Sequence, residues 1–161
     1  MDFTIDTYSD KDRDAVIAGY VDLQEVERAF TDTRHPGLEI AAAYIDALLE
    51  TIDAQSGRMF VASDGEKMAG FVACWVEREE NVAETDDSTT YGYIPDAYVS
   101  PEYRGTGLFQ TLNAKAEEYL TSRSEVKRIR INVLAKNTRA LNAYRKAGYE
   151  DYEIMLEKRV Q

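Results

Sequence analysis

A glycine-bearing loop between a predicted strand and a predicted helix is the stretch best suited to chemistry. The apolar run that ends at Val99 is followed by Pro101, which fixes its own φ and favours an extended backbone before it. Arg104-Gly-Thr-Gly107 comes next, and from Leu108 onward apolar residues recur at helical spacing. The first N–H groups of a helix lack partners and its dipole is positive there, so such a junction can hold phosphate. Glycine lets these donors come close to an anion.

Charge is divided between an acidic front and a basic back. The net charge is −11, with 7 Lys and Arg against 23 Asp and Glu in residues 1–103, and 10 against 3 in residues 104–146. An acidic protein is a poor candidate for nucleic-acid binding, which needs a basic surface. The basic segment begins at the predicted loop and favours a small polyanionic ligand there. Solvated helix and strand faces are the alternative explanation for most of these charges.

The totals predict one soluble domain spanning residues 1–161. The composition is 44% hydrophobic and 30% charged, which is typical of a globular protein. No apolar run is long enough to span a bilayer, and the amino end lacks the form of a secretion signal. We therefore expect a cytoplasmic protein without a membrane partner. The one cysteine, Cys74, lies in an apolar run and is expected to be a buried structural thiol.

The amino half is predicted to contain helices and a hairpin. Asp64-Gly65 separates two strand-like runs and is a strong hairpin signal. The second of these runs is apolar almost throughout, as in a strand covered on both faces. The predicted elements are a strand at 3–8, a helix after Ser9 or Asp10, a second helical pattern within 22–30, a helix from Leu38 to about Asp53, and strands at 58–63 and 67–76.

The carboxyl half alternates strands with helices. Proline cannot donate to a ladder, so Pro95 predicts a bulge or an unpaired edge near residues 95–96. The predicted elements are a mobile acidic loop at 77–88, a strand at 90–99, a helix at 106–122, a strand at 129–133, a helix capped by Asn137 or Thr138 and closed by Gly148, and a final strand from Tyr149 to about Lys158. This order predicts a mixed α/β domain.

Two motifs in this order resemble a known family. Val99-Ser-Pro-Glu-Tyr-Arg-Gly-Thr-Gly107 precedes a helix, and Asn132-Val-Leu-Ala-Lys-Asn-Thr-Arg-Ala-Leu-Asn-Ala-Tyr-Arg-Lys-Ala-Gly-Tyr149 follows. Together they resemble the GNAT superfamily of N-acetyltransferases. The resemblance implies the GNAT-like acyl-CoA N-acyltransferase fold, a predominantly antiparallel sheet flanked by helices. It also implies acetyl-CoA as co-substrate, no metal, and a homodimer whose surface the sequence does not specify.

The resemblance assigns the cofactor contacts residue by residue. Backbone N–H groups of the loop would hold the pyrophosphate, and the Val99 region would pair with the pantetheine amides. Phe109 departs from the family pattern, which has Gly or Ala at that position. Lys136, Arg139 and Arg145 are candidates for the 3′-phosphate by charge. The implied cofactor-binding residues are Tyr98, Val99, Arg104, Gly105, Thr106, Gly107, Leu108, Phe109, Asn137 and Tyr144.

The reaction that the resemblance implies needs a base and an acid. An alkylamine with a pKa of ~10.4 must lose a proton before it attacks a thioester. Asp96, at the end of the strand beside the cofactor, resembles the acidic position of many members and is our candidate base, directly or through water. Pro95 stands where some members carry a second acid. Tyr144 matches the tyrosine that protonates the departing thiolate; a buried aromatic is its structural alternative.

The acceptor is the least specified part of the prediction. A small cationic primary amine fits the acidic loop 77–88 and the acidic front, because opposite charge concentrates it near the site. Protein lysine or N-terminal acetylation, and a non-catalytic acyl-CoA-binding regulatory module on the same fold, remain alternatives. A different nucleotide-binding domain is disfavoured because the phosphate motifs of those folds are missing. His35 is expected to be a surface loop residue.

Overall fold

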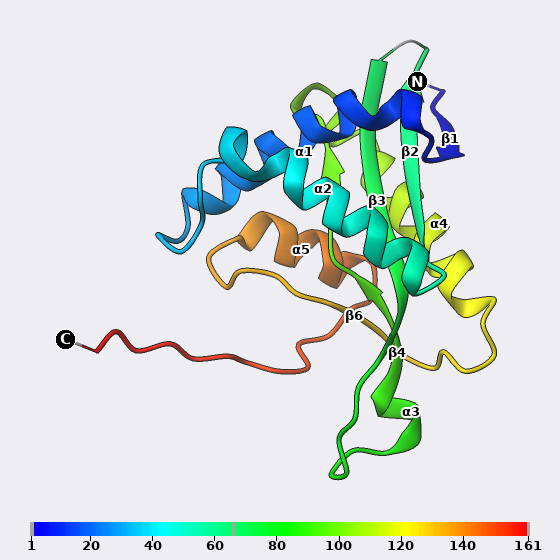
Figure 1. Ribbon diagram of the computed structural model, residues 1–161, viewed down its shortest axis with the longest axis vertical. Helices are drawn as coiled ribbons and strands as arrows, with labels where there is room; N and C mark the ends of the chain where they lie inside the picture. Colours follow the sequence, from blue (N-terminus) through cyan, green and yellow to red (C-terminus); the bar gives the residue numbers. More distant parts are fainter. Residues whose placement is uncertain (1, 66, 161) are drawn as a thin grey trace.

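The computed structural model describes residues 2–65 and 67–160 and shows one six-stranded sheet with helices on both faces (Figure 1). The strand order is β1-β2-β3-β4-β6, and β5 pairs with β3. Every described pair is antiparallel except β4 with β6. The strands are β1 (Thr4–Thr7), β2 (Arg58–Asp64), β3 (Lys67–Arg78), β4 (Thr90–Ile94), β5 (Ala97–Val99) and β6 (Ile129–Ile131), and the helices are α1 (Arg13–Arg28), α2 (Gly37–Ala54), α3 (Asp86–Thr89), α4 (Leu108–Thr121) and α5 (Thr138–Lys146). The predicted mixed α/β fold with a mostly antiparallel sheet is confirmed.

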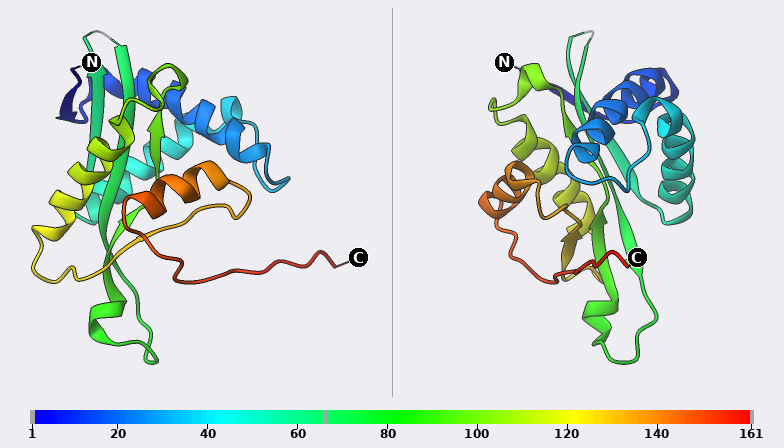
Figure 2. Two further views of the ribbon diagram at one scale, coloured as in Figure 1. Left: turned by 180° about the vertical axis from the view of Figure 1, so that it is seen from behind. Right: turned by 90° about the vertical axis from the view of Figure 1, so that its left-hand side faces the viewer.

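The sheet separates two apolar cores. Helices α1 and α2 pack on one face and helix α4 on the other, with α5 on the same side as α4 (Figure 2). Strand β3 contributes to both cores, which explains why its sequence is apolar almost throughout. Cys74 lies in this strand with 0% of its surface exposed, and burial raises the pKa of its thiol to about 12. The expectation of a buried structural thiol is confirmed.

The structure contains the hairpin predicted in the amino half of the chain, but not the separate second helix predicted there. Strands β2 and β3 form the expected hairpin, and Gly65 takes the left-handed conformation (φ +66°) in its turn. The separate helical pattern expected within residues 22–30 does not form, because α1 continues without a break to Arg28. In the described part of the chain, no helix has both the length and the hydropathy needed to cross a membrane.

The strand expected at 90–99 is divided by a bulge at Pro95 and Asp96. Strands β4 and β5 both pair with β3, but between them they carry one residue more than the opposite stretch of β3. The backbone N–H of Ala73 donates to the carbonyl of Asp96 across this bulge, at 3.0 Å. Within residues 2–65 and 67–160, β6 pairs with β4 alone and β5 pairs with β3 alone, so β5 and β6 are not hydrogen-bonded to one another. The expected irregularity at 95–96 is confirmed.

The final strand expected from Tyr149 to about Lys158 is wrong. Residues 149–160 form no helix or strand, and the segment runs away from the body of the molecule (Figure 1). Alternating apolar residues are a local signal, whereas a strand also needs a neighbouring edge with which to pair. Within this chain the segment lies apart from the sheet, which ends at β6.

Candidate functional site

The glycine loop opens directly into helix α4. Gly105 (φ +79°) and Gly107 (φ +90°) take left-handed conformations, and Gly107 is the N-cap residue of α4. A Cβ added at either glycine would meet no atom within 4 Å, so the space before the helix start is open. The side chain of Leu108 is buried in the core, and the hydroxyl of Thr106 donates to the carbonyl of Tyr103 at 2.6 Å. The N–H groups of Arg104 and Thr106 already donate to the carbonyls of Pro101 and Tyr103 at 3.4 Å. What this region offers to a ligand is therefore the N–H groups of its two glycines and of the first turn of α4.

Two arginines lie near one another, Arg104 in the glycine loop and Arg139 in the first turn of α5. Burial lowers the pKa of Arg104, and the positive charge of Arg139 lowers it further, so the two guanidinium groups lie close enough to repel one another. The Nε of Arg104 donates to the carbonyl of Val99 at 3.2 Å. Arg145 instead forms an ion pair with Asp151 at 2.7 Å. Two neighbouring cations and the N–H groups at a helix start are the kinds of group that bind phosphate.

Asp96 lies at the bulge, in a partly buried position. Burial raises the pKa of its carboxyl group to about 6; a hydrogen bond from Tyr44 opposes this shift, and the charge of Glu27 adds to it. The Tyr44 hydroxyl donates to the Asp96 carboxylate at 2.6 Å. The Tyr44 ring stacks on that of Tyr20, with 4.1 Å between the ring centroids. Helix α2 therefore fixes the position of the Asp96 carboxylate through the hydroxyl of Tyr44.

A cavity of 620 Å³ lies in front of Asp96. A second carboxylate, that of Glu27, also lines the cavity and forms an ion pair with Arg34 at 2.7 Å. No described residue of the acidic loop 77–88 lines it, so the nearby negative charge comes from α1 and the bulge instead. The cavity is lined by Tyr20, Leu23, Gln24, Glu27, Thr33, Arg34, His35, Ile40, Ala43, Tyr44, Tyr93, Pro95, Asp96 and Asn132. His35 is exposed and belongs to the cavity rim.

Tyr144, on helix α5, packs against the start of α4. Its ring contacts that of Phe109 edge-on, with 5.2 Å between centroids. Burial raises the pKa of Tyr144, and the charge of Asp96 raises it further. Phe109, which departs from the family pattern, therefore directs its side chain to α5 and packs against Tyr144.

Two of the residues named from sequence are engaged elsewhere. Tyr98 is buried on the α1 side of the sheet, where its hydroxyl donates to Asp22 at 2.8 Å, and the structure does not bring its side chain to the loop. The side-chain oxygen of Asn137 accepts from the N–H of Ala140 at 3.1 Å and caps α5, as its sequence position indicates. Its side-chain nitrogen is the atom that can reach a ligand.

Sequence reasoning missed the residues that surround Asp96. Tyr20 and Tyr44 belong to helical apolar stripes, which indicate a core position and nothing more. Glu27 is one of many acidic residues in the front half. No local signal distinguishes these three, because the fold brings them to Asp96 from 52 or more positions away in the sequence. Within the described residues, no cluster of His, Cys, Asp and Glu is suited to a metal ion.

Comparisons with known proteins agree on one family. The model of the acetyltransferase (GNAT) family matches residues 20–149. The chain belongs to this family, whose members are acyltransferases. An uncharacterized N-acetyltransferase of Methanocaldococcus jannaschii is 32% identical over 101 residues, which is 60% of this chain and 40% of that protein. The chain thus covers about two fifths of that relative.

Solved structures share the fold over the whole chain. A GCN5-related N-acetyltransferase from Ralstonia eutropha has a TM-score of 0.75 at 17% identity, and the match covers 98% of each chain. An aminoglycoside N-acetyltransferase in complex with CoA has a TM-score of 0.69 at 16% identity, covering 99% of this chain and 95% of that one. At these identities the likeness concerns the fold alone.

Proposed function

We propose that the protein transfers an acetyl group from acetyl-CoA to a small cationic primary amine, by direct attack in a ternary complex. The observation that carries this proposal is Asp96, a partly buried carboxylate with a pKa of about 6 that faces a 620 Å³ cavity and lies on the strand leading into the glycine loop. Family membership supplies the reaction class. The geometry supplies the candidates for each role.

The open end of α4 is the proposed binding site for the pyrophosphate. The N–H groups from about Arg104 to Phe109 precede or begin the helix, and the space before the two glycines is open. The backbone groups of Val99 that do not pair with β3 point toward the gap where β5 and β6 part, the direction that pantetheine amides require. We assign the side-chain nitrogen of Asn137 to a contact with the cofactor arm, since its side-chain oxygen already caps α5. Acetyl-CoA, as substrate, supplies the thioester carbonyl.

Asp96 is the proposed base. A protonated amine must lose its proton before it can attack, and a carboxylate with a pKa near 6 accepts that proton more readily than one with an ordinary pKa near 4. At neutral pH the group is still mostly ionised, so it also attracts a cationic amine. Tyr44 keeps the carboxylate oriented toward the cavity.

Tyr144 is the proposed acid. When the tetrahedral intermediate collapses, the sulfur leaves with the electron pair of its bond to carbon and takes a proton from the phenol. Burial and the charge of Asp96 both keep the proton on Tyr144 until that step, because both raise its pKa. Phe109 holds the ring in place from the start of α4. The loop that binds the donor thus also positions the acid.

The cavity favours a small acceptor over a protein lysine. Tyr20 and Tyr44 provide an aromatic wall, and Glu27 and Asp96 provide two carboxylates, a combination that binds ammonium groups. The aminoglycoside N-acetyltransferase that shares this fold acts on such an amine, which supports the same acceptor class here. A panel of polyamines, aminoglycosides and lysine peptides with acetyl-CoA would identify the acceptor. Binding of CoA without thiol release for any amine would favour the non-catalytic alternative.

The acid role predicts the effect of Tyr144→Phe. Loss of the phenol proton should lower kcat about 100-fold, the low end of general-acid effects, while the Kd for CoA changes less than about twofold. Tyr149→Phe is the matched control, since this ring also contacts Tyr144 but its hydroxyl donates to Glu117 at 2.8 Å. Thiol release under saturating substrates measures kcat, and calorimetry measures CoA binding. Unchanged turnover in Tyr144→Phe would remove this residue from the mechanism.

A further inference from the structure

The carbonyl group of Val99 points away from β3. The N–H of Ser100 donates to the carbonyl of Ala69 at 2.9 Å, so these two residues form a hydrogen-bonded pair of the antiparallel ladder. Such pairs alternate with pairs that share no hydrogen bond, and Val99 faces Gly70 in a pair of the second kind. The N–H and C=O groups of Val99 are therefore directed outward, to the side of β5 that has no strand partner among the described residues.

The side chain of Arg104 contacts this outward carbonyl. Its Nε donates to the Val99 oxygen at 3.2 Å, five residues back along the chain. Arg104 is an exposed residue, and the bond joins its charged donor to a neutral carbonyl in contact with water. A bond of this kind is readily exchanged for one to a stronger acceptor.

The charges around Arg104 favour this position of its side chain. Burial lowers the pKa of Arg104, as does the positive charge of Arg139, whereas the negative charge of Asp22 acts in the opposite direction. Asp22 lies on α1 and accepts a hydrogen bond at 2.8 Å from the hydroxyl of Tyr98, the residue before Val99. These charges draw the guanidinium toward β5 and away from α5.

The contact between Arg104 and Val99 competes with the proposed donor. In the proposed function, the pantetheine amides pair with the outward groups of Val99. A pantetheine N–H would need the carbonyl oxygen that Arg104 contacts, and the guanidinium lies beside β5 where the arm would run. A phosphate group is a stronger acceptor for a guanidinium than a peptide carbonyl is, because it is charged and can accept two parallel N–H groups.

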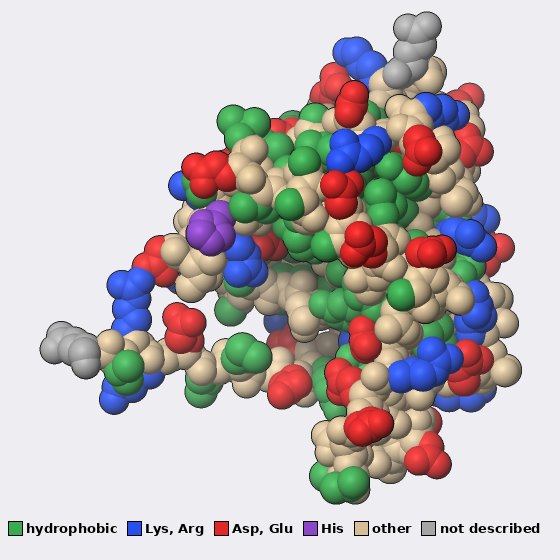
Figure 3. Space-filling model, viewed as in Figure 1, with side chains coloured by type: hydrophobic (Ala, Val, Ile, Leu, Met, Phe, Trp, Pro, Cys, Tyr) green, Lys and Arg blue, Asp and Glu red, His purple; other side chains and the backbone are tan. Residues whose placement is uncertain are grey.

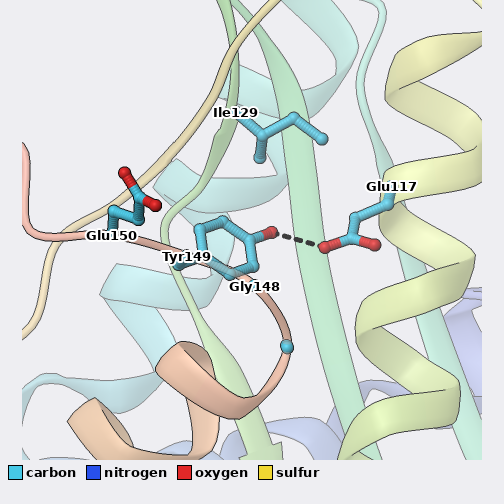
Figure 4. A pocket seen from close by; sticks show the side chains of 6 residues that line it. Glu117, Ile129, Gly148, Tyr149 and Glu150 are labelled. Carbon is cyan, nitrogen blue, oxygen red and sulfur yellow. Dashed lines mark hydrogen bonds between the residues drawn. The ribbon is translucent and has the colours of Figure 1, made fainter.

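The distribution of charge directs a phosphate group to the Arg104 end of α4. On the face that α1 and α2 form, Lys and Arg side chains are scattered among Asp and Glu (Figure 3), and such a mixed surface attracts a polyanion weakly. A cavity of 380 Å³ beside the later turns of α4 is lined by the carboxylates of Glu117 and Glu150. Figure 4 shows these two acids on either side of Tyr149. By contrast, the two glycines that follow Arg104 border open space before the helix start.

We propose that Arg104 makes the protein select a donor that carries phosphate groups at the end of its pantetheine arm. The guanidinium covers the Val99 carbonyl, and the phosphates of CoA draw it to the glycine loop, which uncovers the carbonyl for the arm. A thioester of pantetheine alone has the arm but lacks the groups that move Arg104. Donor selection of this kind rests on the proposed function, because it requires that the arm runs along Val99.

Arg104→Ala should change the binding of CoA and of pantetheine in opposite directions. CoA loses a charged hydrogen bond, so its Kd should rise about tenfold, whereas pantetheine loses a competitor for Val99, so its Kd should fall about threefold. NMR titrations measure both constants, including the weaker one. Arg123→Ala is the matched control, because Arg123 lies at the opposite end of α4 and its Nη2 also donates to a backbone carbonyl at 3.2 Å, that of Ser56. This control should leave both constants within about twofold.

The opposite signs separate donor selection from a structural role of Arg104. Loss of folded structure in the loop would weaken the binding of both ligands. An Arg104→Ala variant that binds pantetheine no more tightly than the wild type does would therefore overturn the proposal and leave the proposed donor in place. A wild type that binds neither CoA nor pantetheine would overturn the donor site of the proposed function, and the role of Arg104 with it.

Discussion

Asp96 shows how a few side chains set the pH range of the proposed reaction. Its carboxyl group would titrate near pH 4 in water, and burial moves its pKa to about 6. Tyr44 limits that shift by donating a hydrogen bond to the ionised form. The pH at which activity falls on the acid side should therefore depend on the hydrogen bond between Tyr44 of α2 and Asp96 at the bulge.

Tyr44→Phe should move this acid limb to higher pH. The rate under saturating substrates rises as Asp96 loses its proton, and without the hydrogen bond the carboxylate is less stable, so its pKa should rise by about one unit. The variant should lose about tenfold at pH 5.5 and much less at pH 8. Tyr20→Phe is the control, because it keeps the ring stack and does not bond to Asp96. A limb that moves equally in both variants, or in neither, would contradict the role given to Tyr44.

The elements that we propose to bind the donor are the glycine loop with the start of α4, and the start of α5. Arg104 lies in the loop that precedes α4 and Arg139 lies in the first turn of α5, and their positive charges repel one another. Such repulsion is relieved when an anion lies between them. Arg145, on the same helix as Arg139, is already paired with Asp151.

Arg139→Ala should therefore raise the Kd for CoA about tenfold, the effect of losing one charged hydrogen bond. Arg145→Ala, the control from the same helix, should change it less than about twofold. Titrations with CoA and with 3′-dephospho-CoA locate the contact: a loss confined to CoA assigns Arg139 to the 3′-phosphate, and an equal loss assigns it to the pyrophosphate. If neither ligand binds Arg139→Ala more weakly, the residue is not part of the site.

Elements with local signals could be predicted, and elements that need a distant partner could not. The turn at Asp64-Gly65, the bulge at Pro95 and the glycine loop follow from what single residues permit. The final strand did not form because alternation is a local signal, whereas a strand also needs a neighbouring edge, and residues 149–160 lie apart from the sheet. Tyr44 was recognisable only as a core residue, since nothing nearby in sequence indicates that its hydroxyl meets Asp96.

At the scale of the whole molecule, the charge division matches the proposed separation of the donor site from the acceptor site. The basic back contains the glycine loop and α5, where the polyanionic donor would bind. The acidic front contains α1, whose Glu27 reaches the cavity. In the proposed reaction, the acidic front would attract a cationic acceptor from a distance, and Glu27 would attract it within the cavity.

Glu27→Gln should raise the KM for a cationic amine about tenfold and flatten its dependence on salt. The change removes a cavity carboxylate and leaves Arg34 unpaired, so the site would repel the acceptor. Glu84→Gln, in the acidic loop that does not line the cavity, alters net charge equally and should leave the KM within about twofold. Initial rates from 10 mM to 0.5 M salt provide the comparison. Equal effects of the two changes would mean that only net charge matters.

The burial of Cys74 has a practical consequence for kinetics and for stability. It is the chain's one cysteine, with 0% exposure in the strand shared by both cores, and its thiol would be poorly ionised even if reached. Colorimetric thiol reagents should therefore detect released CoA without a background from folded enzyme. In the absence of substrates, the rate at which a thiol reagent labels Cys74 should report the rate at which the central strand opens.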